Sequence, residues 1–166
     1  EVNLSGATTS VSNTQLNTIT TAALTTWTTQ TTPSMNGYSI TWSPELKKFV
    51  TVSTGVANKV MNSSDGITWV TQNPATDNDW QDVIWSSELG LFVAVSSSGS
   101  RDRVMISPDG INWTTQSTLD QEWNSVAWSP ELGIFTTVGK TIDIFQQGSK
   151  LVDTRAIGAA RKGISE

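Results

Sequence analysis

The chain has 166 residues, 36% of them hydrophobic and 15% charged, with a formal net charge of −5 and with neither Cys nor His. Without those side chains, disulfides, thiolate nucleophiles, imidazole bases and Cys/His zinc sites are excluded. The acidic balance argues against nucleic acid as a partner, because binding phosphates requires a basic stripe, and no apolar stretch is long enough to insert into a membrane.

The first segment in chain order, residues 1–22, is rich in Thr, Ser and Asn and has few apolar positions. Two interpretations are open: a disordered terminus, or a stalk or extended arm that pairs with a neighbouring chain. Uncharged polar residues of this kind are common in secreted and virion-surface proteins, so we expect an extracellular or virion-surface location. Because the chain begins at Glu1 with neither Met nor a signal peptide, we expect a processed product or an excised piece.

Residues 23–154 carry a repeat. Trp42, Trp85 and Trp128 are each 43 residues apart and open the phrases WSPELKKFVTV, WSSELGLFVAV and WSPELGIFTTV. Fixed-period self-similarity of this length is typical of solenoids, propellers and arrays. Within each unit, short segments rich in β-branched and aromatic residues alternate with turn residues, which predicts four antiparallel strands, named a to d. The expected fold class is all-β, with three β-propeller-like blades. The units are 37–72, 80–116 and 123–154.

Two turns recur in these units. In the c–d turns SSDG and SPDG, the aspartate suits the third turn position, and the glycine suits the left-handed conformation that ends a type I turn. The a–b turns SSELG and SPELG also end in glycine. In the first unit Lys47 and Lys48 break that pattern, so we expect a strained or longer turn there.

The phrases SSDGITW (63–69) and SPDGINW (107–113) resemble the Asp-box, or bacterial neuraminidase repeat, of sialidase-type β-propellers, in a shortened form with Asp and Gly adjacent. The longer phrase, from WSPELG to SPDGxxW, is similar to repeats in structural and fibre-like proteins of phages and large DNA viruses. This resemblance covers residues 38–139 and implies blades whose Asp-box turns are structural and peripheral. The turn residues are Asp65, Gly66, Trp69, Asp109, Gly110 and Trp113. We also expect Trp27, Trp42, Trp85 and Trp128 to pack within the sheets.

The expected strands do not complete a ring. Residues 23–30, ALTTWTTQ, copy a d strand but have no a, b or c strand before them. The third unit lacks the Asp-Gly turn and the d-strand Trp expected near Ala156, and the tail 155–166 predicts a short helix or no regular structure. Known propellers usually hold about 4–8 blades. Three explanations are open: a fragment of a longer protein, copies that share a ring, or an open stack, which is the least stable because its edges are unpaired.

The loops vary more between units than the turns do. The b–c and d–a loops differ from unit to unit, and in a propeller they share one face, where binding usually takes place. Aromatic rings beside carboxylates and amides suit sugar recognition. Asp77, Asp79 and Asp82 also offer oxygen ligands for Ca²⁺, but without a glycine-bearing loop in register we expect no metal and no other cofactor. The candidate ligand-binding residues are Asn58, Asp77, Asp79, Trp80, Arg101, Asp102, Asp120, Glu122 and Trp123.

No catalytic set is marked out. A sialidase requires three arginines and a tyrosine nucleophile, whereas Tyr38 is the only tyrosine here and two of the four arginines lie in the tail. A triad is impossible without histidine, and no pair of carboxylates stands out. We therefore expect a non-catalytic structural or attachment module of a virion or extracellular assembly. Its expected partners are further copies or other subunits, and a cell-surface glycan or receptor. The alternatives are a soluble sialidase-like propeller lectin and a fragment of a sialidase-type glycoside hydrolase.

Overall fold

The computed structural model describes residues 27–55, 57–118, 120–139 and 144–147. All regular structure in these ranges is β, and they contain no helix that could cross a membrane. The chain divides into two compact units, Glu1–Thr31 and Thr32–Glu166. The expected N-terminal stalk, the start of the first d-like segment and the C-terminal tail lie outside the described residues.

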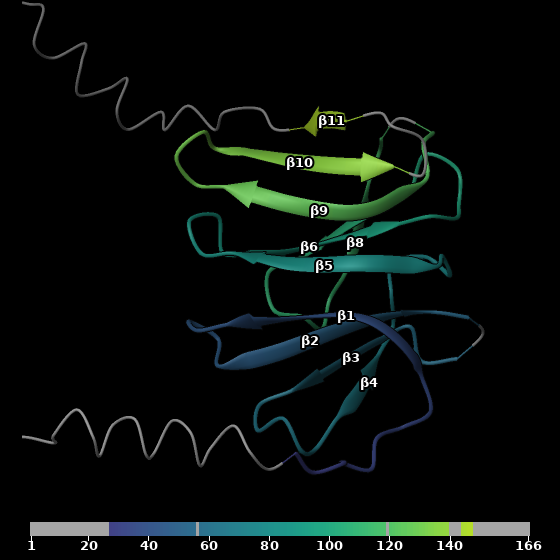
Figure 1. Ribbon diagram of the computed structural model, residues 1–166, viewed down its shortest axis with the longest axis vertical. Helices are drawn as coiled ribbons and strands as arrows, with labels where there is room; N and C mark the ends of the chain where they lie inside the picture. The colour runs from purple at the N-terminus through teal and green to yellow at the C-terminus, as the bar shows by residue number, and fades with distance from the viewer. Residues whose placement is uncertain (1–26, 56, 119, 140–143, 148–166) are drawn as a thin grey trace, which may run out of the picture. The chain divides into compact units, whose positions relative to one another are not determined.

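The second unit contains two four-stranded antiparallel sheets and one sheet of three described strands, each in chain order (Figure 1). Sheet 1 consists of β1 (Asn36–Ser43), β2 (Lys48–Thr54), β3 (Val60–Ser63) and β4 (Val70–Gln72). Sheet 2 consists of β5 (Trp80–Ser86), β6 (Leu91–Ser96), β7 (Val104–Ser107) and β8 (Thr114–Gln116). Sheet 3 consists of β9 (Trp123–Ser129), β10 (Ile134–Gly139) and β11 (Ile144–Gln147). The expected all-β class and the four-stranded antiparallel sheets are confirmed.

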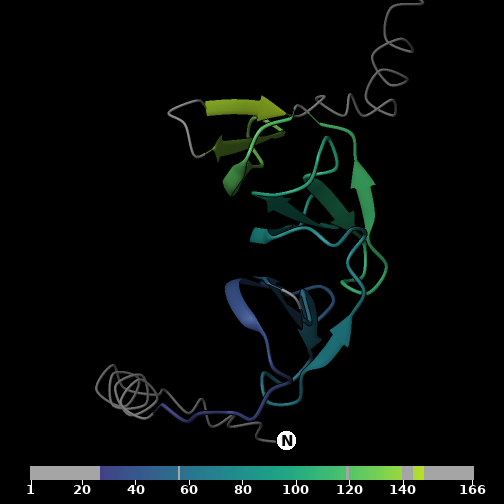
Figure 2. The ribbon, with the colours of Figure 1, turned by 90° about the vertical axis from the view of Figure 1, so that its right-hand side faces the viewer.

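The three sheets are stacked face to face in chain order. β1 lies against β5, and β5 lies against β9, so the a strands run side by side (Figure 1, Figure 2). Burial of apolar side chains between the sheets is the main favourable term for such a stack. The core between sheets 1 and 2 contains Val50, Val52, Val60, Trp80, Val83, Phe92, Ala94, Met105 and Trp113. Between sheets 2 and 3, the buried core residues within the described ranges are Val95, Trp123 and Val126.

A tryptophan and a phenylalanine face each other across strands a and b in every sheet. The ring centroids are 4.4 Å apart in sheet 1 and 4.5 Å apart in sheets 2 and 3. The pairs are Trp42 with Phe49, Trp85 with Phe92 and Trp128 with Phe135. Tilted rings at this separation stabilise a sheet beyond their buried area, which agrees with the structural role expected for these tryptophans. Trp27 differs, because its side chain is 89% exposed.

Each a strand contains a bulge near its start. The register shifts just before Ser39 in β1 and just before Asp82 in β5, and a third shift lies opposite Ser125 in β9. A bulge bends the strand and redirects the side chains that follow it. The three redirected side chains, 43 residues apart, lie between neighbouring sheets.

The a–b turns of all three sheets have a left-handed backbone conformation at the same position. Gly90 and Gly133 have φ values of 63° and 64°, and Lys47 takes the same place in sheet 1 with φ of 48°. Of the two expectations for this turn, the strained one holds, because a side chain occupies a conformation that suits glycine.

Candidate functional site

The first Asp-Gly turn is held by the Asp65 carboxylate and the Ser63 hydroxyl. Asp65 Oδ1 accepts hydrogen bonds from the amides of Thr68 at 2.7 Å and Ile67 at 2.8 Å. Ser63 Oγ accepts from the Gly66 amide at 2.8 Å and donates to Asp65 Oδ1 at 3.0 Å. These bonds, the two amides foremost, lower the pKa of Asp65 to about 2. The aspartate acts as a turn anchor.

The second Asp-Gly turn repeats this geometry. Asp109 Oδ1 accepts from the amides of Ile111 and Asn112 at 2.8 Å, and Asp109 Oδ2 accepts from Asn112 Nδ2 at 2.8 Å. Burial raises the pKa of Asp109, but the hydrogen bonds from Asn112 and Ile111 outweigh it and bring the pKa to about 2. Both oxygens of this carboxylate therefore accept hydrogen bonds from its own turn, which fits a structural role.

The second turn also attaches sheet 2 to sheet 1. Lys48 Nζ donates to the carbonyl of Asp109 at 2.7 Å, and Asn62 Nδ2 donates to the carbonyl of Gly110 at 3.0 Å. A Cβ on Gly110 would lie 2.7 Å from Val50 Cγ2, so only glycine fits this contact. The structural role expected for the turn therefore includes joining neighbouring sheets.

The tryptophans after the two turns differ in burial. Trp113 is buried in the core between sheets 1 and 2, with its ring centroid 6.3 Å from that of Phe92. Trp69 is half-buried at the same distance from Phe49, and its Nε1 donates to the Gly66 carbonyl at 3.3 Å. Both rings pack within or between sheets rather than facing a ligand.

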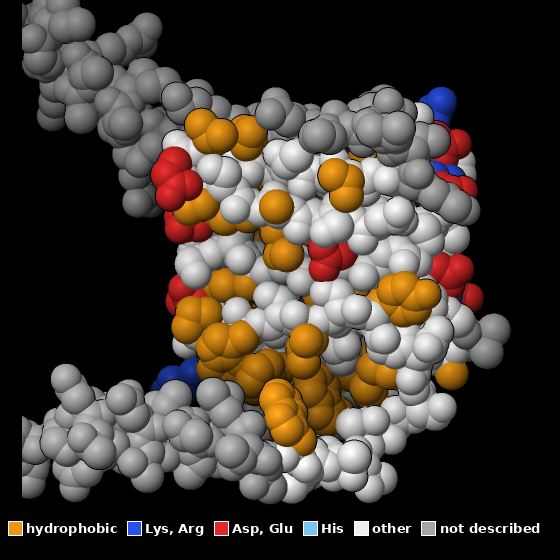
Figure 3. Space-filling view, in the orientation of Figure 1, with side chains coloured by type: hydrophobic (Ala, Val, Ile, Leu, Met, Phe, Trp, Pro, Cys, Tyr) orange, Lys and Arg blue, Asp and Glu red, His pale blue; other side chains and the backbone are white. Residues whose placement is uncertain are grey.

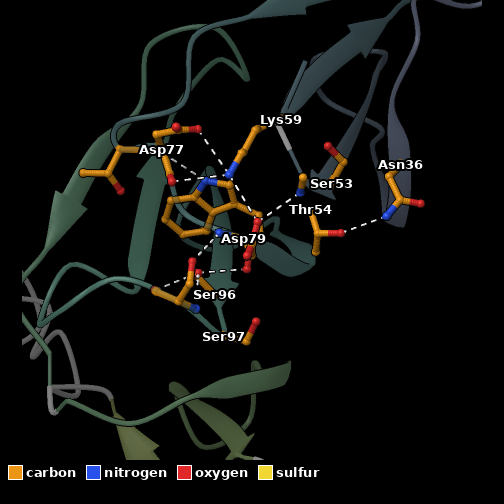
Figure 4. Close-up of polar contacts among 12 residues, drawn as sticks. Asn36, Ser53, Thr54, Lys59, Asp77, Asp79, Ser96 and Ser97 are labelled. Carbon is orange, nitrogen blue, oxygen red and sulfur yellow. Dashed lines mark hydrogen bonds and ion pairs between the residues drawn. The ribbon is translucent and has the colours of Figure 1, made fainter. Parts of the chain in front are cut away.

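The first part of the loop rim is organised by Lys59, which was not among the candidate residues. Lys59 Nζ lies 3.2 Å from Asp77 Oδ1 and 3.2 Å from Asp79 Oδ1, and it reaches both from a buried stem (Figure 4). The Gly55 amide donates to Asp79 Oδ1 at 3.0 Å, and this bond, with Lys59, lowers the pKa of Asp79 against the effect of burial. Ser96 Oγ donates to the Asp79 carbonyl at 2.8 Å. The b–c and d–a loops thus lie side by side, as expected.

The second part of the rim is held by Asn78 and Arg103. Asn78 Nδ2 donates to the carbonyl and to Oδ1 of Asp102, at 3.1 and 3.2 Å. Arg103 Nη2 lies 3.2 Å from Asp120 Oδ1 and donates to the Gly99 carbonyl at 2.7 Å. Most rim carboxylates are therefore occupied by the neighbouring loop.

The remaining candidate residues occupy different settings. Asn58 and Arg101 both have left-handed backbones, with φ of 49° and 62°. The Asn58 side chain donates to the Ser34 carbonyl at 2.7 Å, whereas the Arg101 carbonyl accepts from the Thr118 amide at 3.0 Å. Glu122 is exposed just before β9. Four of the nine candidates are exposed to solvent, namely Asp77, Arg101, Asp120 and Glu122.

The expected rim position of Trp80 and Trp123 is wrong. Both side chains are buried, Trp80 between sheets 1 and 2 and Trp123 between sheets 2 and 3. Trp80 Nε1 donates to the Thr76 carbonyl at 3.3 Å. Each a strand begins inside the stack, so its first ring fills the space between two sheets and offers no free face for a sugar.

Asp82 lies apart from the rim and links all three sheets. Its Oδ1 accepts from Ser39 Oγ of sheet 1 at 2.6 Å. Its Oδ2 accepts from Ser125 Oγ at 2.7 Å and from the Val126 amide at 2.9 Å, both in sheet 3. The Val83 amide donates to Ser39 Oγ at 3.3 Å, so the contact between sheets 1 and 2 repeats between sheets 2 and 3. We name this row of contacts the seam.

This placement separates the three carboxylates that were considered for Ca²⁺. Asp77 and Asp79 pair with Lys59, whereas Asp82 belongs to the seam. No three His, Cys, Asp or Glu side chains gather as a metal site anywhere in the described part of the chain. The repeated spacing of Ser39, Asp82 and Ser125 is the one sequence signal that would have marked the seam.

A second repeated contact joins the a–b turns of sheets 1 and 2 to the next sheet. Trp85 Nε1 donates to Glu45 Oε2 at 2.7 Å, and Trp128 Nε1 donates to Glu88 Oε2 at 2.7 Å. The pKa of Glu45 is lowered by a backbone hydrogen bond of its own and by hydrogen bonds from Ser87 and Trp85. Glutamate in the turn and tryptophan in the next a strand are therefore a matched pair between sheets.

The two outer faces of the stack expose positions that are buried in the other sheets. Ile40 in β1 is 57% exposed, whereas the equivalent Val83 and Val126 are 1% and 5% exposed. Hydrophobic side chains gather over sheet 1 in the lower part of Figure 3. At the opposite end, Val138 in β10 is 41% exposed, whereas its equivalents in β2 and β6 are fully buried. Ile40 with Trp42 is named the open face of sheet 1.

No family model matches the chain, and no curated protein matches it. The resemblance of the two Asp-Gly turns to the Asp-box stays a prediction. The function of the chain is therefore inferred from its own contacts and exposed faces.

Proposed function

We propose that the chain is a non-catalytic structural module of propeller-like blades, which acts by self-association in a virion or other extracellular assembly. The observation that carries this proposal is the open face of sheet 1. Ile40 is exposed there although the same position is buried in sheets 2 and 3. A sheet face with the apolar pattern of an internal contact favours burial against a further sheet.

The loop rim supports a structural rather than a catalytic role. Lys59 forms ion pairs with both Asp77 and Asp79, and Arg103 pairs with Asp120. Hydrolysis of a glycoside needs one carboxyl group that donates a proton and a second that is free to act as base or nucleophile. Carboxylates held by a neighbouring loop are poorly suited to either task.

The lectin and sialidase alternatives lose support from the same residues. Trp80 and Trp123, the two rings expected to stack on a sugar, are buried between sheets. The Arg103 guanidinium, which a sialidase would need for the substrate carboxylate, is held by Asp120 and the Gly99 carbonyl. Attachment to a glycan would have to rely on the few exposed side chains of the rim, such as Arg101.

Light scattering on the full chain over a wide concentration range tests the proposal. We expect the mass to rise with concentration above that of one chain. A glycan array and a sialoside hydrolysis assay on the same sample should show neither saturable sugar binding nor turnover. A single-chain mass at every concentration, or turnover of the sialoside, would contradict the proposed function.

A further inference from the structure

We infer that sheet 3 of one copy docks on the open face of sheet 1 of a second copy, and that residues 27–30 of the second copy add the fourth strand to that sheet 3. This inference rests on the proposed function, because it names the contact by which the copies associate. The contact is head to tail and repeats, between copies, the contacts that join the sheets within one chain.

The first argument is the matched pair of glutamate and tryptophan. Within the chain, the turn glutamate of each sheet accepts from the tryptophan of the next sheet, at 2.7 Å in both cases. The glutamate and the tryptophan that have no counterpart within this series are Glu131 and Trp42, at opposite ends of the stack of sheets. Glu131 is exposed and accepts from Ser129 of its own turn at 3.2 Å. No hydrogen bond from Trp42 Nε1 occurs within the described ranges, so Glu131 of one copy and Trp42 of the next can form the third pair.

The second argument is the seam. Within the chain, the side chain at Ser39 accepts from the Val83 amide, and Asp82 accepts from the Val126 amide. The next acceptor in this row is Ser125 Oγ, and Ser125 is exposed. Between copies it would accept from the amide of Ile40, which begins the open face of sheet 1.

The third argument is the pair of exposed apolar positions. Val138 on the outer side of sheet 3 and Ile40 on the outer side of sheet 1 are both exposed. Inside the stack, Val52 and Val83, at the equivalent positions, belong to one buried core. Docking of sheet 3 on sheet 1 would bury Val138 and Ile40 in the same way.

The fourth argument is the strand count. Residues 27–30 read WTTQ, the same letters as residues 113–116, of which Thr114–Gln116 form β8 at the edge of sheet 2. Gln30 stands seven residues before Gly37, just as Gln116 stands seven residues before Trp123. Residues 27–30 therefore have the position of a d strand in a sheet that precedes sheet 1. Among the described strands of sheet 3, β11 is the last in the order β9-β10-β11, and the inference places residues 27–30 of the copy on which sheet 3 docks beside β11.

These four features favour a second copy over other occupants. The acceptors lie on sheet 3 and the donors on sheet 1, so the two surfaces are different and complementary. Such a heterologous contact either closes a ring or extends as a filament. A symmetric contact between two open faces of sheet 1 would place donor opposite donor.

One residue near the start of β1 departs from the repeat, and this departure predicts how strongly two copies associate. Trp80 and Trp123 fill the space between sheets, but Gly37 has the equivalent place in sheet 1. A Cβ on Gly37 would meet only the Met35 side chain, at 3.9 Å. We therefore expect the contact between copies to be weaker than the contacts within the chain, and reversible on dilution.

A mixing experiment with two variants tests the inference. Ile40→Asp damages only the open face of sheet 1, and Glu131→Lys damages only the outer end of sheet 3. Each variant alone should associate at least about tenfold more weakly than the native chain in analytical ultracentrifugation, since one loses the buried apolar side chain and the other the acceptor for Trp42. Mixed in equal amounts, they should form dimers and nothing larger, because each supplies the surface that the other lacks. Ile111→Asp is the control, since Ile111 stays exposed although sheet 2 has a neighbour on both sides.

Two further variants strengthen the test. Gly37→Trp restores the missing ring and should tighten association about tenfold or more, and this gain should disappear in the double variant Gly37→Trp/Glu131→Lys. Trp27→Ala should weaken association without lowering the unfolding temperature measured at concentrations at which the chain is single. Circular dichroism confirms that each variant is folded.

The outcomes separate the inference from the proposed function. A native chain that stays single at every concentration would overturn both. Native association that is unaffected by Ile40→Asp and Glu131→Lys, or a mixture of the two that gives no dimer, would overturn the docking and leave self-association standing. Association that does not respond to Trp27→Ala would overturn the strand addition.

Discussion

At the scale of single residues, the a–b turns offer a direct measurement of backbone strain. Lys47, Gly90 and Gly133 have the same left-handed conformation at the same place in three sheets. A non-glycine residue in this conformation costs about 1 kcal/mol or slightly more. We expect Lys47→Gly to raise the free energy of unfolding by about 1 kcal/mol, measured by chemical denaturation. Gly90→Lys, the reverse change in sheet 2, should lower it by a similar amount, and a loss of stability in Lys47→Gly would contradict the assignment.

The glycines of the two Asp-Gly turns allow the cost of backbone strain to be measured separately from the cost of a packing clash. Gly66 and Gly110 have φ values of 72° and 68°, but a Cβ on Gly66 would find only Phe49 Cε2 at 3.6 Å, whereas one on Gly110 would lie 2.7 Å from Val50 Cγ2. Alanine at Gly66 should cost about 1 kcal/mol from the backbone alone. Alanine at Gly110 should cost about 3 kcal/mol, because the contact with sheet 1 must also shift. Equal losses of stability in the two variants, measured by thermal unfolding, would show that the turn at Gly110 is not packed tightly against sheet 1.

The same turns predict the acid sensitivity of the fold. The pKa values of Asp65 and Asp109 lie near 2, below the ordinary value of 3.8. A carboxyl group whose pKa is lowered by folding stabilises the native state above its unfolded pKa, and this stabilisation disappears as the pH falls through the folded pKa. The unfolding temperature should therefore fall between pH 4 and pH 2, where both turns lose their anchors. Asp109→Asn should flatten this dependence in part, while a pH profile identical to that of the native chain would remove Asp109 from the explanation.

At the scale of strands and turns, the sequence was most informative where a local rule decides the structure. Alternation of β-branched residues with turn residues is enough to place the strands, and Asp109 with Gly110 is enough to place a turn. Trp80 was misplaced because its burial depends on the neighbouring sheet, which no local pattern reveals. Lys59 was missed for the same reason, since its two partners lie in the following d–a loop.

The carboxylate of Asp82, in sheet 2, accepts hydrogen bonds from both sheet 1 and sheet 3. Removal of this carboxylate in Asp82→Ala leaves Ser39, Ser125 and the Val126 amide without their acceptor, and should cost about 2–3 kcal/mol. Asp82→Ser, which copies the residue at this place in sheets 1 and 3, should cost about 1 kcal/mol. Asp77→Ala should cost less than about 1 kcal/mol, because the Asp77 side chain is exposed and Lys59 keeps Asp79 as a partner. Similar values for all three variants in urea denaturation would show that the seam contributes little to stability.

At the scale of the whole stack, the sequence predicted that the strands do not complete a ring but not which side chains this leaves exposed. Ile40 and Val83 have equivalent places in the repeat and similar side chains, so pattern alone expects both to be buried. Only the presence of a neighbouring sheet distinguishes them. The exposed ends are therefore a property of the number of sheets, and they become visible only once the order of stacking is known.

The unequal cores between the sheets predict the order in which the stack opens. Among the described residues, nine buried hydrophobic side chains join sheets 1 and 2, whereas three join sheets 2 and 3. Because local opening is easiest where few apolar contacts are lost, the amides of β9 and β10 should exchange with deuterium before those of β2 and β6. At concentrations at which copies associate, exchange should slow in β1 and β9–β11 but not in β7, which is already covered. Uniform exchange along all described strands would mean that the stack unfolds as one cooperative unit, and slowing confined to the loops would place the contact between copies on the rim instead of on the open faces.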